Sequence, residues 1–365
     1  MKIRVLHVID HLGYGGAPLV VKGLVETLPA DRVENFVCAL RSNARTIDIK
    51  ATVTTLDCHK YSLATVKAIA QLCAERRIDV VHAHLQKAII SSLLAARRLD
   101  AAVILHEHGP IFRGGTGCIY RFVLKHWGPR ARAIIANSQA TGTAMRRVLG
   151  TDDVPVEVVP NAVDVKRFDP ACYDPAPIRR HLGLPDDAVV VGFVGRLDVC
   201  KGIDLLLEAA RILCAPDPRY RFVIVGEGNE RDRLERMARQ SKLESHVLFT
   251  GLCENPAEMM RVFDIGVVPS RREAFGITAI ELMCMGVPVV AAPVGGLPEH
   301  VQDRQTGLLL PRLEPALIAE AVRQLANDRA LRDAIVERAR TYAQRFDGAD
   351  QARAIEDLYT CVVRR

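Results

Sequence analysis

The sequence lacks the features of a membrane-spanning or secreted protein. None of its uncharged apolar runs reaches the roughly 18 residues that a membrane-spanning helix needs. The opening MKIRVLHVIDHLGYGG carries Asp10 and His11 where a signal peptide would continue its apolar region, and it has no small-residue cleavage site. The ten cysteines include neither a C-x-x-C pair nor a cysteine–histidine set with zinc spacing. We therefore expect a cytoplasmic protein whose cysteines are reduced.

Two nucleotide-binding signatures are absent as well. The Walker A pattern G-x-x-x-x-G-K-[ST] does not occur. The loop HLGYGGAP contains Gly13, Gly15 and Gly16, but Pro18 stands where a dinucleotide fingerprint needs its third glycine. The second predicted strand also ends on Arg41 instead of an acid, which indicates against a hydride-transferring enzyme. These glycines either let backbone amides approach a ligand closely or form a tight turn from strand to helix.

The positive charge is concentrated in the first half of the chain. Residues 1–165 contain 21 basic and 14 acidic residues, whereas residues 166–365 contain 28 basic and 29 acidic residues. This excess suits an anionic surface or acceptor, or it is ordinary solvated surface charge.

Short apolar runs alternate with helical segments, as in parallel α/β sheets. Strands are expected at 3–9, 35–40, 79–84, 102–108 and 132–138, and then at 188–195, 221–228, 246–251, 264–270 and 287–293. A proline-rich connector separates the two sets. We predict two facing, Rossmann-like, doubly wound domains, 1–165 and 166–345, with a helical tail, 346–365, packing back across a domain. Ligands of such folds bind beyond the carboxyl ends of the strands, so the cleft between the domains is the expected site.

Paired cations follow the first strand of the second half. Gly195 allows a sharp turn, and Arg196 and Lys201 then lie at the start of a predicted helix. A helix N-terminus beside two cations suits a diphosphate. The alternative is a loop with two surface cations.

Paired acids flank the apolar run AFGITAI. Glu273 precedes a predicted helix, and Glu281 lies about one turn inside it. Ionised carboxylates accept hydrogen bonds, so one acid could hold a ribose diol and the other a sugar hydroxyl. Alternatively, one acid faces solvent and the other stabilises the helix start.

Two His-x-His pairs end neighbouring strands: His82 with His84, and His106 with His108. Because no carboxylate or cysteine has matching ligand spacing, we predict no metal site. We interpret His82 and His84 as structural, and expect His108, just before Gly109, to face a cleft.

Residues 110–133 mix aromatic and basic side chains on a predicted amphipathic helix. Such a helix either lies on an anionic membrane surface or packs its aromatic face on the sheet, and one helix can do both. No recognition motif accompanies the charge, so we expect no nucleic-acid partner.

Nearly the whole chain resembles glycosyltransferase family 4, strongly in 185–311 and more weakly in 1–150. The likeness rests on GRLDVCKG, VGEGNERDRLE, EAFGITAIE and GVPVVAAPVGGLPE, in that order, and on DVVHAHLQKA and VVPNAVDVKRFDP earlier in the chain. The resemblance implies the GT-B fold and a retaining, nucleotide-sugar-dependent enzyme, with a UDP-sugar among the candidate donors. It also implies front-face transfer without an obligatory metal or other cofactor.

The resemblance also implies roles for individual residues. Glu273 matches the family acid that holds donor-sugar hydroxyls, and Glu281 the acid that holds the ribose. Arg196 and Lys201 match the basic pair that stabilises the leaving diphosphate. His108 matches the first-domain histidine that reaches the donor sugar. The other donor-binding positions offer mainly backbone amides: Gly15, Gly16, Gly195, Phe275, Gly276 and Ile277.

We therefore expect transfer of a sugar from a nucleoside diphosphate to a saccharide or lipid-linked acceptor, in cell-envelope polysaccharide, lipopolysaccharide or glycolipid synthesis. The alternatives are a sugar-nucleotide epimerase or phosphorylase of GT-B fold, or a non-catalytic binding subunit. Two departures from the family pattern stand out. Pro18 replaces a common acid in the glycine loop, and Ala162 replaces glycine in the connector.

Overall fold

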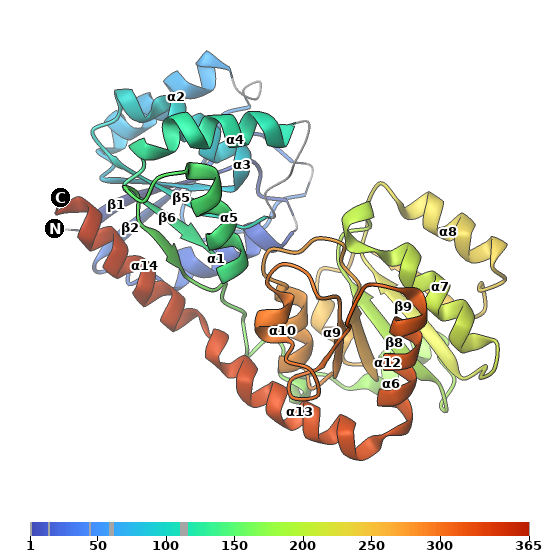
Figure 1. Ribbon diagram of the computed structural model, residues 1–365. Coiled ribbons are helices and arrows are strands. Elements are labelled where there is room, and N and C mark those ends of the chain that lie inside the picture. The colour runs from blue at the N-terminus through green and yellow to red at the C-terminus, as the bar shows by residue number, and fades with distance from the viewer. Residues whose placement is uncertain (1, 14, 44, 58–61, 110–115, 365) are drawn as a thin grey trace. The chain divides into compact units, whose positions relative to one another are not determined.

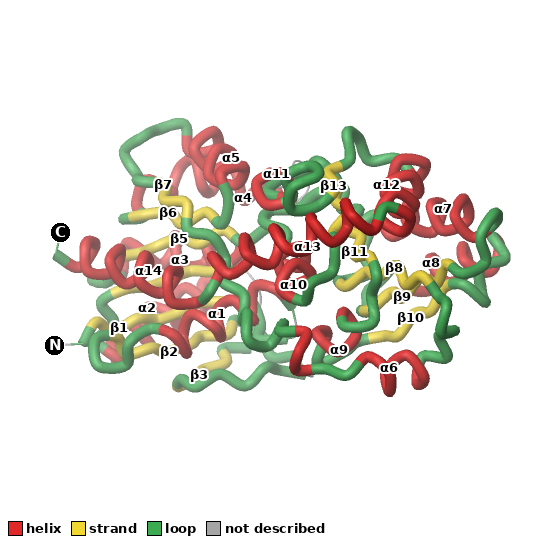
Figure 2. Tube along the Cα trace, turned by 90° about the horizontal axis from the view of Figure 1, so that it is seen from below, coloured by secondary structure: helices red, strands yellow, loops and turns green. Residues whose placement is uncertain are grey.

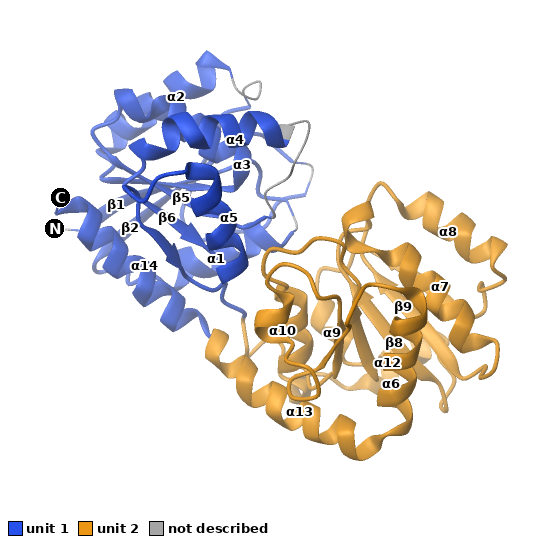
Figure 3. Cartoon of the chain, viewed as in Figure 1, with its two compact units in different colours: residues 1–163, 347–365 blue, residues 164–346 orange. Residues whose placement is uncertain are grey.

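The computed structural model describes residues 2–13, 15–43, 45–57, 62–109 and 116–364. It divides into two compact units (Figures 1 and 3). The first unit comprises residues 1–163 and 347–365, and the second comprises residues 164–346. The C-terminal helix therefore belongs to the first unit.

The first unit is built on a parallel sheet of seven strands in the order β3-β2-β1-β4-β5-β6-β7. The strands are β1 (Ile3–Ile9), β2 (Val33–Ala39), β3 (Thr52–Thr55), β4 (Val80–His84), β5 (Ala102–Glu107), β6 (Ala133–Ala136) and β7 (Val156–Val158).

Helices cover both faces of this sheet. Alternate β1 residues show the division: Leu6 packs with the helices of one face and Val5 with those of the other. The first group contains α2 (Leu63–Arg76), α3 (Leu85–Ala95), α4 (Thr116–Trp127) and α5 (Gln139–Leu149), and the second contains α1 (Gly16–Thr27) and α14 (Gly348–Val363).

The helix ends follow from the sequence. Ser62 and Ser138 each cap a helix by accepting a hydrogen bond from the backbone N–H three residues later, at 3.1 Å in both cases. Gly150 ends α5 in the left-handed conformation that an L side chain rarely adopts.

The second unit contains a parallel sheet of six strands in the order β10-β9-β8-β11-β12-β13 (Figure 2). Its strands are β8 (Val189–Val194), β9 (Tyr220–Val225), β10 (Val247–Gly251), β11 (Ile265–Val268), β12 (Val289–Ala291) and β13 (Leu308–Leu309). Its helices are α6 (Pro175–His181), α7 (Ile203–Cys214), α8 (Arg231–Gln240), α9 (Pro256–Met260), α10 (Ile277–Cys284), α11 (Leu297–His300), α12 (Pro315–Asn327) and α13 (Arg329–Ala343).

The predicted class, two Rossmann-like α/β domains with parallel sheets, is confirmed. Three strands were not predicted. The β3 segment TVTT is largely exposed, and β7 and β13 have only three and two residues, so none of them forms a long apolar run. No helix in the described ranges has both the length and the apolar character needed to cross a membrane.

Candidate functional site

The basic loop of the second unit follows β8. Asp198 organises this loop, because its carboxylate accepts a hydrogen bond from the Cys200 amide at 2.9 Å and pairs with the Arg196 guanidinium at 2.6 Å. The Arg196 side chain is 75% exposed. This arginine is therefore held by one neighbouring acid and otherwise extends into solvent.

Lys201 and Glu273, predicted separately, bind each other. Lys201 Nζ lies 2.7 Å from Glu273 Oε2, and both side chains are largely buried. The Ser270 hydroxyl donates to the same carboxylate oxygen at 3.3 Å. No hydrogen bond to the other carboxylate oxygen, Oε1, occurs within the described residues.

A second ion pair fixes the basic loop against the acidic loop. Arg271 donates to both carboxylate oxygens of Asp204, at 2.7 and 2.8 Å, and to the Val199 carbonyl at 3.0 Å. Burial raises the pKa of Asp204, but the Arg271 hydrogen bonds and charge outweigh this effect and bring the pKa below its ordinary value. A Cβ atom at Gly202 would lie 2.0 Å from the Pro269 carbonyl oxygen, so the two loops are in direct backbone contact.

Glu281 lies in the second turn of α10 and is partly buried. Burial raises the pKa of its carboxyl to about 7, and the nearby Arg167 charge partly opposes this rise. Within the described part of the chain, its carboxylate accepts no hydrogen bond from a side chain or from the backbone. It is a partly buried acceptor whose protonation changes near neutral pH.

Helix α10 begins at a glycine N-cap that has no side chain to bond the first amides of the helix. Gly276 is the N-cap in the left-handed region, with φ 91°, and Ile277 is the first helical residue. The Phe275 ring is buried against His300 and Phe346, with ring centroids 4.5 and 5.8 Å away. Because the ring faces the core, Phe275 can offer only its backbone to a ligand, and the predicted donor contact of its amide stays a prediction.

A glycine pair supports the acidic loop from behind. Gly295 has φ 57°, and a Cβ atom there would lie 1.6 Å from the Glu273 carbonyl oxygen. At the neighbouring Gly296, a Cβ would lie 2.5 Å from the Ala274 carbonyl oxygen. The segment PVGGLPE thus positions Glu273 through close backbone contact.

In the first unit, Gly15 is the N-cap of α1 and Gly16 is its first residue. Gly15 has no side chain to cap this helix, and within the described residues its first amides are open to an acceptor from elsewhere. Tyr14, inside the predicted glycine loop, lies outside the described residues.

His108 belongs to an array of five histidine rings on β1, β4 and the end of β5. Its Nε2 lies 3.0 Å from His84 Nδ1, and His84 Nε2 lies 3.1 Å from His7 Nδ1. In parallel, His106 Nδ1 lies 3.2 Å from His82 Nε2. The strand register explains the array, since His7 stands opposite His82 and His84 opposite His106.

These five rings are neutral at pH 7. Burial lowers the pKa of each ring, to about 4 for His7 and His108 and well below the ordinary value for His82, His84 and His106. His108, expected to face a cleft, is only partly exposed and directs Nε2 into the array. Its role toward a donor sugar stays a prediction.

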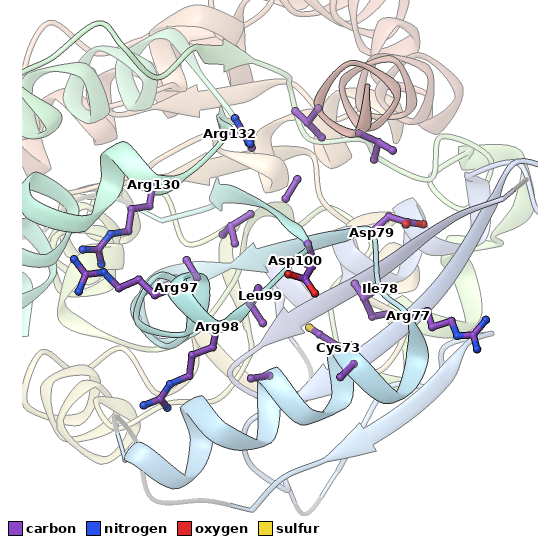
Figure 4. A pocket seen from close by; sticks show the side chains of 18 residues that line it. Cys73, Arg77, Ile78, Asp79, Arg97, Arg98, Leu99, Asp100, Arg130 and Arg132 are labelled. Carbon is purple, nitrogen blue, oxygen red and sulfur yellow. The ribbon is translucent and has the colours of Figure 1, made fainter. Parts of the chain in front are cut away.

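A recess of about 950 Å³ lies elsewhere in the first unit, at the amino ends of β4, β5 and β6 (Figure 4). It contains no predicted site residue, so it is separate from the candidate site. Its charged lining residues are Arg77, Arg97, Arg98, Arg130, Arg132, Asp79 and Asp100.

Comparisons with known proteins identify the family. A family described as "Glycosyltransferase Family 4" matches residues 14–167, and one described as "Glycosyl transferases group 1" matches residues 175–342. A D-inositol 3-phosphate glycosyltransferase of Xylanimonas cellulosilytica is 30% identical over 306 residues, covering 79% of this chain and 73% of that protein. The chain belongs to glycosyltransferase family 4.

Other family 4 relatives match over shorter spans. A D-inositol 3-phosphate glycosyltransferase of Streptomyces bingchenggensis is 35% identical over 245 residues, covering 64% of this chain and 54% of that protein. The chain thus spans about half the length of such curated relatives. Anabaena Alr3699/HepE, solved in complex with UDP and glucose, superposes with a TM-score of 0.85 at 24% identity, covering 99% of this chain and 100% of that one. The fold is GT-B.

The sequence did not predict a role for three residues of the candidate site: Arg271, Asp204 and His7. Arg271 and Asp204 are separated by 67 residues, and nothing in either segment indicates their pairing. His7 was not grouped with the other histidines because it has no His-x-His partner. A polar residue inside an otherwise apolar strand was the only signal that could have singled it out.

Proposed function

We propose that this protein is a retaining glycosyltransferase that moves a sugar from a nucleoside diphosphate, such as UDP, to a saccharide or lipid-linked acceptor. The observation that carries the proposal is the joining of two loops in the second unit. The basic loop with Arg196 and Lys201 is bonded to the acidic loop with Glu273, directly before the helix that carries Glu281.

The donor diphosphate would bind at the basic loop. Arg196 is exposed, and its one ion pair in the described part of the chain is with Asp198, so it can turn its guanidinium toward a phosphate at little cost. Lys201 is fixed by Glu273 and supplies a positioned charge. As the bond to the sugar breaks, negative charge grows on the diphosphate, and both cations stabilise it without an obligatory metal.

The two acids would hold the hydroxyl groups of the donor. Glu273 uses one oxygen for Lys201, and its other oxygen can accept from the sugar. Among the described residues Glu281 has no hydrogen-bond donor, so ribose hydroxyls would supply the donors that its carboxylate lacks. The amides at Phe275, Gly276 and Ile277 would complete the donor contacts.

First-unit residues would complete the donor and acceptor contacts. The open amides at Gly15 and Gly16 suit a phosphate or hydroxyl oxygen, and His108 is the proposed contact to the donor sugar. The names of the relatives make D-inositol 3-phosphate one acceptor to test. Cell-envelope polysaccharides and glycolipids are the wider acceptor class.

The decisive experiment measures transfer from a panel of nucleotide sugars in variants with intact folding. Arg196→Ala and Lys201→Ala should each lower kcat/KM about 10- to 150-fold, because losing a charged hydrogen bond costs about 1.5–3 kcal/mol. Arg312→Ala is the matched control, since Arg312 is also exposed and pairs with an acid two residues away, Glu314. Normal transfer by the Arg196/Lys201 double variant would refute the phosphate role.

The same assay separates the alternatives. An epimerase would change the donor sugar without an acceptor, a phosphorylase would need inorganic phosphate, and a binding subunit would leave the donor intact. Donor turnover that depends on a saccharide or lipid acceptor is the result expected here.

Helix α4 would place the enzyme on the cytoplasmic face of an anionic membrane. Tyr120 and Leu124 are fully buried, whereas Ile119 and Phe122 are 54% and 55% exposed beside Lys125. One face therefore packs on the sheet, and the other offers apolar side chains with positive charge. The beginning of the predicted segment, 110–115, lies outside the described residues.

Co-sedimentation with anionic vesicles at low salt tests this attachment. The Ile119→Ser/Phe122→Ser double variant should bind markedly less than the parent protein, while Leu63→Ser, at a 73% exposed position on α2, should bind equally well. Equal sedimentation of all three proteins would contradict membrane binding through α4.

A further inference from the structure

The histidine array contains polar atoms whose hydrogen bonds are incomplete. Four buried side-chain atoms find no hydrogen-bond partner among the described residues: His106 Nε2, His108 Nδ1, Asn137 Oδ1 and Asn161 Oδ1. They lie at the carboxyl ends of β5, β6 and β7, which are neighbours in the sheet. Buried polar atoms without partners are rare and costly, so several at one sheet edge indicate a missing partner.

The other histidines of the array are satisfied. His7 bonds His84 and Asn35, and His82 bonds Tyr359 and His106. A cation bound between His7, His82 and His84 would have to break these hydrogen bonds. The unsatisfied nitrogens belong only to His106 and His108, whose rings stack with centroids 3.9 Å apart.

Asn35 determines where the proton sits on His7. Its amide group donates to the Val25 carbonyl at 3.3 Å, which the helix leaves open because Pro29 has no N–H. The Asn35 oxygen therefore faces His7 Nε2, at 3.1 Å, and accepts its proton. This leaves Nδ1 of His7 without a proton.

The same reasoning extends to His108, because each neutral ring carries one proton. His84 donates from Nε2 to His7 and accepts at Nδ1, so His108 must donate from Nε2. Nδ1 of His108 is then a bare lone pair. Asn161 lies within hydrogen-bond reach of His108 and has an unsatisfied oxygen of its own.

A bound cation would give a partner to more of these unsatisfied atoms than a flip of the Asn161 amide group would. Turning the Asn161 amide would satisfy His108 but leave His106 Nε2 without a partner. One ring nitrogen from each of His84, His106 and His108 lies within 4.8 Å of the others, and the His106 and His108 rings stack with centroids 3.9 Å apart, so two imidazoles lie side by side at this position. His106 presents a bare Nε2 when it donates from Nδ1 to His82, whose own Nδ1 proton then goes to the Tyr359 hydroxyl. In this tautomer both ligand rings are neutral and bind a cation without first losing a proton.

We propose that His106 Nε2, His108 Nδ1 and the Asn161 amide oxygen bind a divalent cation of the zinc type. Imidazole nitrogens favour Zn²⁺, Co²⁺, Ni²⁺ and Cu²⁺ over Mg²⁺ or Ca²⁺. His82 and His84 hold the other nitrogens of the two ligand rings, at 3.2 and 3.0 Å, as the supporting partners of metal-bound histidines do. The ion is structural. With His108 Nε2 bonded to His84 and Nδ1 bound to the ion, the ring has no nitrogen left for a sugar, so the proposed donor contact of His108 belongs to the metal-free protein.

The partial exposure of His108 gives the ion a route from solvent. Asn161 follows β7 and lies next to Pro160, whose carbonyl accepts from Gln351 of α14 at 2.9 Å. A bound ion would therefore join the end of β5 to the last segment of the first unit before the second unit begins.

The test uses the full, untagged chain, freed of metal by a chelator and titrated with Co²⁺ and Zn²⁺. We expect one equivalent of Co²⁺ to bind with visible absorption typical of nitrogen and oxygen ligands, and Zn²⁺ to raise the Tm of the Trp127 fluorescence transition. His106→Gln and His108→Gln should each weaken binding at least about tenfold. His126→Gln, on the exposed side of α4, is the matched control and should bind as the parent does.

Three results would overturn the proposal. The first is that the parent protein fails to bind Co²⁺ stoichiometrically, and the second is that both glutamine variants bind Co²⁺ as the parent does. The third is thiolate absorption, which would show that cysteines hold the ion. If His106→Gln does not fold, His108→Gln and Asn161→Ala give the same comparison. Because the readouts are binding and Tm, failure here leaves the proposed transfer untouched.

Discussion

Replacing Glu281 by glutamine should change how stability depends on pH. Burial raises the pKa of this carboxyl from 4.5 to about 7. Between these values the unfolded chain loses the proton while the folded chain keeps it, so unfolding releases a proton and stability falls as the pH rises. Below 4.5 the two states bind the same number of protons, and above about 7 the loss is complete.

The magnitude follows from the two pKa values. At about 1.36 kcal/mol for each pH unit, the difference amounts to roughly 3 kcal/mol as an upper limit. Glu281→Gln has no proton to lose, so it should become more stable relative to the parent as the pH rises from 5 to 8. Guanidinium unfolding followed by far-UV circular dichroism measures the change.

Trp127 supplies an internal control for this experiment. It is the sole tryptophan of the sequence and lies in the first unit, whereas Glu281 lies in the second. The fluorescence transition should therefore shift equally with pH in the parent and the variant. Equal pH dependence of the circular dichroism transitions in the two proteins would refute the raised pKa of Glu281. If the carboxylate also holds the ribose, the affinity for UDP should rise through pH 7 only in the parent.

Three further predictions test the packing around the sites. Gly295→Ala should lower the free energy of unfolding by several kcal/mol and weaken donor binding, because its Cβ meets the Glu273 carbonyl oxygen at 1.6 Å. Gly183→Ala is the control: it has a similar φ of 64° but open space around it, so it should lower the free energy of unfolding by only about 1–2 kcal/mol. Equal losses of stability in the two variants would contradict the close contact between Gly295 and the Glu273 carbonyl oxygen. Tyr359→Phe should lower the Tm of the first unit, because His82 Nδ1 loses its hydrogen-bond partner at 2.6 Å. In denaturant unfolding, the free energy of unfolding should fall by about 1–3 kcal/mol, and a change outside this range would count against the bond.

The sequence predicts strands well where they are buried on both faces. The first strand has the predicted bounds, 3–9, and β4 is buried at every residue. Such strands form continuous apolar runs, which a reader of the sequence can recognise. The short strands β7 and β13 are defined by pairing with a neighbour, and pairing leaves no local signal.

The sequence indicated which residues belong to the candidate site, but not the ion pairs and hydrogen bonds that join them. Arg196, Lys201, Glu273 and Glu281 were chosen because charged residues near helix starts suit a phosphate and hydroxyl groups. Their partners could not be predicted, since the Lys201–Glu273 pair joins residues 72 positions apart and depends on how β8 and β11 adjoin. Local patterns indicate which side chains are chemically suitable, and the fold decides which of them meet.

The charge asymmetry illustrates the same distinction. The excess of 21 basic over 14 acidic residues in 1–165 suggested an anionic partner but not its location. Five arginines line the recess at the amino ends of β4, β5 and β6, together with only two acids. The predicted donor and histidine residues lie instead at or beyond the carboxyl ends of strands. Much of the basic excess is therefore outside the proposed donor site. The two residues proposed to bind the donor's phosphates, Arg196 and Lys201, lie in the half of the chain whose net charge is close to zero.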